Sequence, residues 1–160
     1  MSVLSESAPR VALPDLPQDP EFGVPVPFAC TRDYSVGGGG TVRRVEIKRV
    51  WQCALSRICG LCGTTLSRPV AFLGTELEVG RNSFHFPPLH VECARTAQAV
   101  YAALPANALG IGDKEAFGDV GDEPHEPWQL VTTSGFEFVR PTSEQVDRRP
   151  VFEPNSLLSA

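Results

Sequence analysis

The chain has 160 residues, of which 42% are apolar and 21% are charged, and its net charge at pH 7 is −5. This length suits one domain with its own core, and no apolar run approaches the roughly 18 residues that a membrane-spanning helix needs. The first residues, MSVLSESAPR, lack the pattern of a secretory signal, so we expect a cytoplasmic protein without a membrane partner. In that reducing compartment, close-set cysteines are expected to be metal ligands or redox groups rather than disulfides.

Charge is unevenly distributed along the chain. Eight basic and four acidic side chains give residues 41–103 a net charge of +4, whereas residues 1–40 carry −3 and residues 104–160 carry −6. Such asymmetry is typical of an interaction surface, or of an acidic segment that folds back over a basic core. The basic middle favours a nucleic-acid partner and the acidic total favours a protein partner, so both stay open.

The N-terminal region, residues 1–28, is rich in proline and has no amphipathic period. We expect a disordered or extended arm, with one extended piece at VPVPF, residues 24–28. The glycine run 37–40 is expected to be a flexible connector, because no Lys-Ser/Thr pair follows it as in a phosphate-binding loop. We expect a single domain over residues 29–140.

The segment TVRRVEIKRVWQCALSR begins with rough alternation and takes a helical pattern from about Lys48 to Arg57, since Val50, Cys53 and Ala54 fall on one side. Basic side chains gather in it; they are Arg43, Arg44, Lys48, Arg49 and Arg57. They form either a solvated face or a set of phosphate contacts beside a rigid module. We therefore treat them as candidate partner-binding residues.

Two short strands are expected in SRPVAFLGTELEVGRNSFHF, around Phe72 and Phe84, with a turn or bulge between them. Two prolines then open the clearest predicted helix, Leu89–Leu104, because proline suits a first helical turn.

The rest of the chain shows weaker patterns. An acidic, glycine-rich loop is expected over residues 106–127, and residues 128–140 are typical of a β-hairpin with Ser134-Gly135 at its turn. Residues 141–160 are expected to be a loosely ordered tail.

The strongest functional signal is a pair of short motifs. Cys59 and Cys62 stand in RICGLCG, and HVEC supplies His90 and Cys93 after 27 intervening residues. Three thiolates and one imidazole are a tetrahedral set that zinc prefers in structural sites. His90 and Cys93 lie on one face of a first helical turn, where the positive end of the helix favours thiolates. We predict one structural Zn²⁺ at these four residues.

A redox pair and a coincidence of spacing are the alternatives. A redox C-x-x-C opens a helix in a βαβ unit, whereas here glycine follows both cysteines and no such unit surrounds them. Four protein ligands leave no open position for water or substrate, which favours a structural metal.

Other residues are weaker candidates. We expect Cys30 to be a loop thiol, Cys53 a packed thiol, and His85 a strand residue with its ring turned outward. An enzyme site around His85, with Asn82 and Arg81, is the alternative.

The order of knuckle, short hairpin and ligand-bearing helix is that of a treble-clef zinc unit. We therefore predict an α+β fold: a small treble-clef unit with an additional C-terminal β-hairpin and irregular, Pro/Gly-rich flanks. The predicted function is a zinc-stabilised module without catalytic activity that binds a protein or nucleic acid. The alternative is a metal-dependent enzyme, such as a degenerate nuclease.

The chain resembles a group of small zinc-binding proteins of bacteriophages and actinobacteria that have no established reaction. The resemblance lies in VPVPF, ICGLCGTTLSRPVAFLG, PPLHVECA and WQLV, and spans roughly residues 24–140. It implies metal ligation at Cys59, Cys62, His90 and Cys93. The helix here continues RTAQAVYAALP without the further cysteine of many relatives, so no role of that cysteine carries over.

The knuckle is also similar to the zinc-binding part of HNH endonucleases, which share the treble-clef scaffold. Those enzymes hold a catalytic metal with an aspartate–histidine pair on the first hairpin strand and a second histidine on the helix. Here the strand RPVAFLGTELEVG has no histidine, and His90 is already assigned to zinc. The similarity therefore implies the scaffold without the nuclease machinery.

Overall fold

The computed structural model of the chain describes residues 16–32, 40–106, 108–112, 124–144 and 149–159. Three predicted segments lie wholly or partly outside the described residues: the first half of the arm (1–15), most of the glycine connector (37–39) and much of the acidic loop (113–123). The described residues form helices and small antiparallel sheets, which confirms the predicted α+β class. None of the helices in these ranges has the length and apolar character to cross a membrane.

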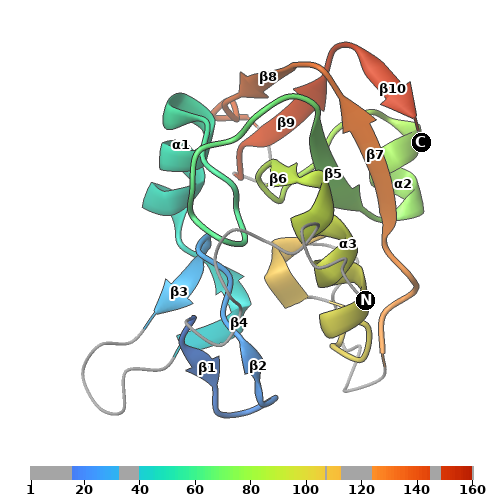
Figure 1. Cartoon of the computed structure of the whole chain (residues 1–160). Coiled ribbons are helices and arrows are strands. Elements are labelled where there is room, and N and C mark those ends of the chain that lie inside the picture. The colour runs from blue at the N-terminus through green and yellow to red at the C-terminus, as the bar shows by residue number, and fades with distance from the viewer. Residues whose placement is uncertain (1–15, 33–39, 107, 113–123, 145–148, 160) are drawn as a thin grey trace.

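The largest sheet in the described residues has four antiparallel strands in the order β10-β7-β5-β6 (Figure 1). Their bounds are β5 Val70–Gly74, β6 Leu89–His90, β7 Gln129–Thr133 and β10 Leu157–Ser159. Every residue of β5 is buried, as expected for an apolar strand inside a sheet. Because Val70 pairs with His90, the start of β5 lies beside the chain that leads into the last helix.

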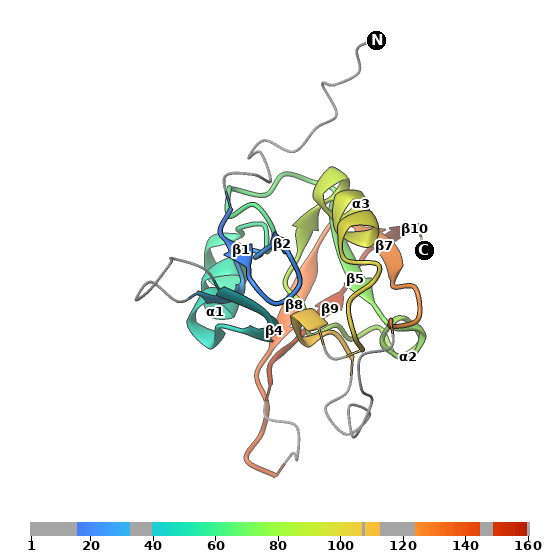
Figure 2. The ribbon, with the colours of Figure 1, turned by 90° about the horizontal axis from the view of Figure 1, so that it is seen from below.

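Within the described ranges, three two-stranded sheets and short helices surround this sheet. Their bounds are β1 Gln18–Asp19, β2 Val24–Pro25, β3 Cys30–Arg32, β4 Gly40–Val45, β8 Phe136–Val139, β9 Val151–Pro154, α2 Glu76–Gly80 and the 3₁₀ helix η3 Ala108–Gly110. Strands β1–β4 gather at one end of the molecule, and β8–β10 lie at the other (Figure 1). Figure 2 looks along this direction from the β1–β4 end.

Both long predicted helices are present. α1 spans Ile47–Ser56 and buries Val50 and Cys53, which lie on the predicted side. α3 spans Val91–Val100 and is shorter than the predicted range 89–104. The first two residues of that range are extended, because they pair with β5 as β6 before the helix begins.

The strand predicted around Phe72 is β5, but the strand predicted around Phe84 is wrong. The chain forms α2 directly after β5, and a capping box begins this helix. The Thr75 hydroxyl accepts the N–H of Glu78 at 3.2 Å, and the Glu78 carboxylate accepts the N–H of Thr75 at 3.0 Å. Phe84 follows α2 and makes an isolated β-bridge with Phe152.

The predicted C-terminal hairpin contains two strands, β7 and β8, but they do not pair with each other. The chain changes sheet at Ser134-Gly135, where the Thr133 hydroxyl donates to the Gly135 carbonyl at 2.7 Å. β7 then pairs with β5 and β10, whereas β8 pairs with β9. Instead of pairing with each other as a hairpin, β7 and β8 therefore pair with strands from the last residues of the chain, β10 and β9.

Residues 149–159, expected as a loosely ordered tail, supply those partners as β9 and β10. Phe152 explains why this segment is held in place. It is fully buried, it exchanges two backbone hydrogen bonds with Phe84 at 2.9 and 2.7 Å, and its ring packs against Phe72.

Residues 16–28, expected as part of the arm, also pack against the rest of the chain. The buried Asp19 accepts the N–H of Val42 at 2.8 Å, and the N–H of Phe28 donates to the Leu61 carbonyl at 3.0 Å. A proline-rich extended segment makes such contacts through individual residues, so its sequence shows no amphipathic period from which the packing could be predicted. Packing of the described residues thus extends past 29–140 on both sides.

Candidate metal centre

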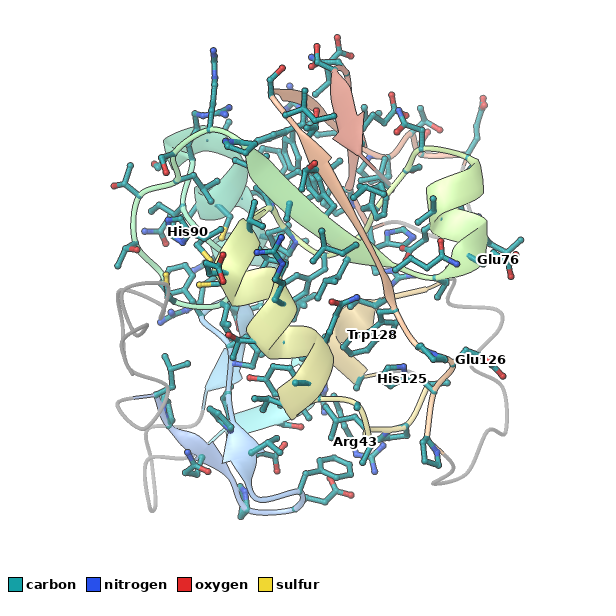
Figure 3. All side chains as sticks on the ribbon, turned by 45° about the vertical axis from the view of Figure 1, so that its right-hand side comes forward. Arg43, Glu76, His90, His125, Glu126 and Trp128 are labelled. Atoms are coloured by element: carbon teal, nitrogen blue, oxygen red, sulfur yellow. The ribbon has the colours of Figure 1, made fainter. Side chains whose placement is uncertain are left out.

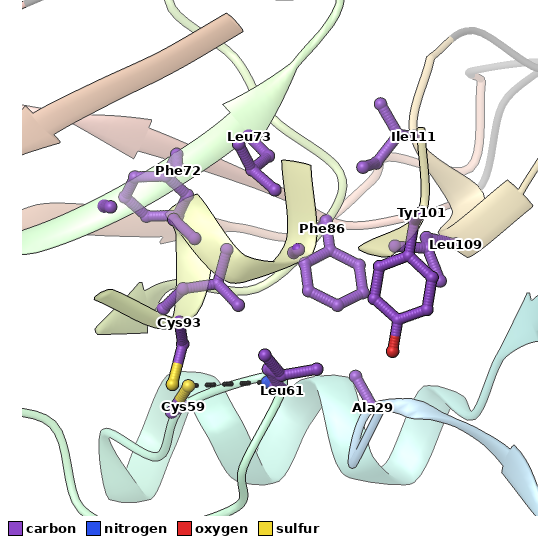
Figure 4. Close-up of a cluster of buried hydrophobic side chains, with 14 of the residues drawn as sticks. Ala29, Cys59, Leu61, Phe72, Leu73, Phe86, Cys93, Tyr101, Leu109 and Ile111 are labelled. Carbon is purple, nitrogen blue, oxygen red and sulfur yellow. Dashed lines mark hydrogen bonds between the residues drawn. The ribbon is translucent and has the colours of Figure 1, made fainter. Parts of the chain in front are cut away.

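The two short motifs meet at one end of α3. Cys59 and Cys62 lie in the turn after α1, His90 is the last residue of β6, and Cys93 is in the first turn of α3. One potential ligand atom from each of the four lies within 4.8 Å of the others. Figure 3 shows the His90 ring beside the sulfur atoms, and Figure 4 shows Cys59 and Cys93 with their sulfurs adjacent. The clustering predicted from the spacing is confirmed.

The turn that carries the first two cysteines, residues 58–65, is closed by backbone hydrogen bonds. A β-bridge joins Ile58 to Thr65 at its base, and the N–H of Gly63 donates to the Cys59 carbonyl at 3.0 Å. Gly63 has a φ of +77°, and a Cβ there would lie 2.8 Å from the Phe28 ring. Glycine is therefore required at this position for both conformation and space.

Donor groups in this turn point at the cysteine sulfurs. The N–H of Leu61 donates to Cys59 Sγ at 3.4 Å, drawn as a dashed line in Figure 4. The Thr64 hydroxyl lies 3.1 Å from Cys62 Sγ and can donate to it. Such hydrogen bonds favour the charged thiolate, the form of cysteine that binds a metal.

His90 is oriented by a contact on the far side of its ring. Its Nε2 lies 2.9 Å from the Thr65 carbonyl oxygen, which can only accept, so Nε2 carries the donating hydrogen. In the neutral ring this leaves the Nδ1 lone pair directed at the sulfurs of Cys62 and Cys93. Metal-binding histidines commonly have such a carbonyl partner.

The distances from the imidazole nitrogen to two of the sulfurs match those around a zinc ion. Bond lengths of about 2.3 Å to sulfur and about 2.0–2.1 Å to nitrogen place the two donor atoms about 3.5–3.6 Å apart at a tetrahedral centre. The observed distances from His90 Nδ1 are 3.5 Å to Cys62 Sγ and 3.7 Å to Cys93 Sγ.

Proximity also shifts the acidities of these groups. Contact with Cys59 and Cys62 raises the pKa of His90 to about 10, and hydrogen bonds from Cys59 and Cys93 lower the pKa of Cys62 below its ordinary value of 9.0. Hydrogen bonding to Cys59 and Cys62 raises the pKa of Cys93. One thiolate beside an imidazolium is favoured here, whereas three thiolates need a cation to offset their repulsion.

The two remaining cysteines lie outside the cluster. Cys30 is a buried residue of β3 rather than the predicted loop thiol, because residues 30–32 pair with β4. Cys53 is packed in α1 as predicted, and burial raises its pKa to about 12, which keeps it a thiol. All five cysteines are free of disulfides.

The candidate basic residues occupy different surroundings. Arg43 pairs with Glu21 at 2.7 Å. The guanidinium groups of Arg43, Arg49 and Arg57 lie over the rings of Phe22, Phe28 and Phe136, respectively. Arg49 also donates to the Phe28 carbonyl at 3.3 Å. Arg44 and Lys48 are exposed. The structure thus places three of the five on separate rings, and a common role in partner binding stays a prediction.

His85, the centre of the alternative enzyme site, is buried, so the predicted outward ring is wrong. Its ring Nδ1 faces the Pro150 carbonyl at 3.4 Å, because the C-terminal segment covers it. The side-chain amide of Asn82 donates to the Pro154 carbonyl at 2.7 Å. Arg81 is exposed. Sequence reasoning missed the residue that organises this region, Glu78.

Glu78 is fully buried, and its carboxylate oxygens accept the N–H groups of Thr75 and His85 at 3.0 and 3.2 Å. Burial raises the pKa of Glu78 above its ordinary value of 4.5, while hydrogen bonds from backbone amides, including that of Gly112, oppose the rise. The carboxyl group joins α2 to two neighbouring segments. The TELE capping box was the sequence signal that could have identified it.

Replacing Glu78 by glutamine should lower the free energy of unfolding by about 1–3 kcal/mol near pH 5, because the amide NH₂ cannot accept from one of the backbone N–H groups. The native wild type binds a proton more tightly than the unfolded chain does, so its stability falls as pH rises from 4.5 through the raised pKa. The glutamine variant lacks this fall. Urea unfolding of both proteins from about pH 5 to about pH 8 should show the difference shrinking; a difference that grows with pH would contradict the raised pKa.

The fold and the cluster define a class: a mixed α+β protein in which a cluster of three cysteines and one histidine can hold a metal ion. Comparison with known proteins adds no relative to this description, since no family model, no curated protein and no solved structure matches the chain.

Proposed function

We propose that this protein is a zinc-stabilised binding module, without catalytic activity of its own, that recognises a protein or nucleic-acid partner. The observation that carries the proposal is the clustering of three sulfurs and one imidazole nitrogen within 4.8 Å. These four donors match the number that a structural zinc ion takes, which leaves no position for substrate. The carbonyl behind His90 and the donors beside the sulfurs support the same assignment.

We also propose that the unit is of the treble-clef type. Its support is the chain order: the cysteine turn, the antiparallel pair β5–β6, and α3 with the last ligand in its first turn. α2 is then an insertion between the two strands of the hairpin. Kinship with the bacteriophage and actinobacterial group rests on the sequence motifs alone.

The test is the metal content of the full chain, purified without a metal-affinity step and without added zinc. We expect one zinc per chain, and we expect a chelator to abolish the circular dichroism signal and the cooperative melt, because metal binding and folding are coupled in such sites. A folded, metal-free chain would contradict the proposal. Iron, or a second metal per chain, would favour the enzyme instead.

A further inference from the structure

The outer side of α1 carries an apolar stripe that the core does not use. Ile47, Trp51 and Leu55 are spaced four residues apart and therefore lie in line along the helix. Ile47 is 47% exposed and Leu55 is 70% exposed, while Val50 and Cys53 make the buried face of the same helix. Exposed apolar side chains in a continuous row mark interaction sites more often than single ones do.

Trp51, at the middle of this stripe, contacts two side chains of β8 and its extension. The edge of its ring system meets Phe138 at 5.2 Å between centroids, and the Arg140 guanidinium lies over it at 5.4 Å. Phe138 and Arg140 are two residues apart and so share one face of the β8 strand and its extension, while Glu137 lies on the other face. Tryptophan and arginine are both enriched among the residues that contribute most of the binding energy at protein interfaces.

The charges along the stripe are mainly positive, and the one acidic residue next to it in the sequence is the N-cap of α1, Glu46. α1 and its C-cap, IKRVWQCALSR, contain no acidic residue, although the whole chain has a net charge of −5. Lys48 is exposed and lies beside Leu55 on the helical projection, and Arg140 caps the indole. A partner that covers the stripe therefore gains from carboxylates at its edge.

The same features disfavour nucleic acid as the occupant. Single-stranded nucleic acid is bound by stacking bases on open aromatic faces, but Arg140 lies over the indole and aliphatic side chains form the rest of the stripe. The guanidinium groups of Arg49 and Arg57 lie on other aromatic rings. Isoleucine and leucine flanked by lysine match an amphipathic peptide instead.

We propose that the α1 stripe, Ile47, Trp51 and Leu55 with Lys48 and Arg140 at its edge, is the docking surface for an acidic, amphipathic segment of a protein partner. The inference rests on the proposed function, because α1 ends at Ser56, and its C-cap Arg57 stands two residues before the proposed ligand Cys59. A metal held by the cysteine turn would fix the end of the helix and with it the stripe.

The experiment selects binders from a library of random 16-residue peptides displayed against the full, zinc-loaded chain. We expect enrichment of peptides that combine leucine or phenylalanine with aspartate or glutamate. Leu55→Asp should weaken an enriched synthetic peptide at least about tenfold in fluorescence anisotropy, and Lys48→Glu should weaken it about fivefold. Leu77→Asp, at an equally exposed leucine of α2, is the matched control and should leave binding within about twofold.

The other outcomes overturn the inference. An acidic segment is excluded as the occupant if the enriched peptides are basic or bind Leu55→Asp as well as wild type. It is also excluded if no peptide is enriched. An oligonucleotide that competes for the stripe would assign it to nucleic acid, and self-association lost in Leu55→Asp would assign it to a second copy. Zinc content is measured on every variant. Peptide binding by a zinc-free chain would overturn the proposed function but keep the proposed docking surface. One zinc per chain without selective peptide binding would overturn the docking surface alone.

Discussion

The Cys93→Ser variant is expected to bind no zinc and to lose its cooperative thermal transition. Cys93 is fully buried, and its sulfur lies 3.7 Å from His90 Nδ1 within the cluster. A serine hydroxyl is a far weaker zinc ligand than a thiolate, so the site would keep only three donors. Because structural zinc contributes folding free energy of order 10 kcal/mol at neutral pH, its loss is comparable to the whole stability of a typical domain. Elemental analysis and a circular dichroism melt measure both effects.

Cys53→Ala is the matched control, since Cys53 is also a fully buried cysteine but lies outside the cluster. We expect it to keep one zinc per chain and to lose only about 1–2 kcal/mol of stability, the cost of a small cavity. Cys59→Ser should behave as Cys93→Ser does. A Cys93→Ser protein with full zinc content and the wild-type melting temperature would remove the basis of the proposed function.

The cluster was predictable because its information is local. The spacing within RICGLCG and HVEC fixes which donors can meet in each half, and the helix start places His90 beside Cys93. The supporting contacts were not predictable in the same way. The group behind His90 is the backbone carbonyl of Thr65, and a carbonyl has no residue signature in a sequence.

The two largest errors in the strands have different physical causes. The sequence pattern predicts a turn or bulge between the strands around Phe72 and Phe84, but the reciprocal hydrogen bonds between Thr75 and Glu78 begin a helix there. The S/T-x-x-E signal of that helix is present in the sequence, and Phe84 makes an isolated β-bridge with Phe152 in place of the predicted strand. The hairpin of residues 128–140 failed for a non-local reason, since the pairing of β8 depends on β9, which lies at the end of the chain.

Phe152→Ala is expected to lower the free energy of unfolding by about 3–5 kcal/mol, because it removes a fully buried aromatic side chain from the core. The ring lies within 6 Å, centroid to centroid, of three others, at 5.9, 5.7 and 5.1 Å from Phe72, Phe136 and Phe138. Its neighbours belong to β5 and β8, so the cavity would open between β9 and these two strands. Urea unfolding of the zinc-loaded protein measures the loss.

The matched control for this prediction is Leu158→Ala, in the neighbouring strand β10, where the side chain is 60% exposed. Its stability should stay within about 0.5 kcal/mol of wild type. Both variants leave the four cluster residues intact, so each should keep one zinc, and a large loss in Phe152→Ala alone would show that the last strands stabilise the fold independently of the metal. A loss below about 1 kcal/mol in Phe152→Ala would return residues 149–159 to the loosely held tail that their sequence suggests.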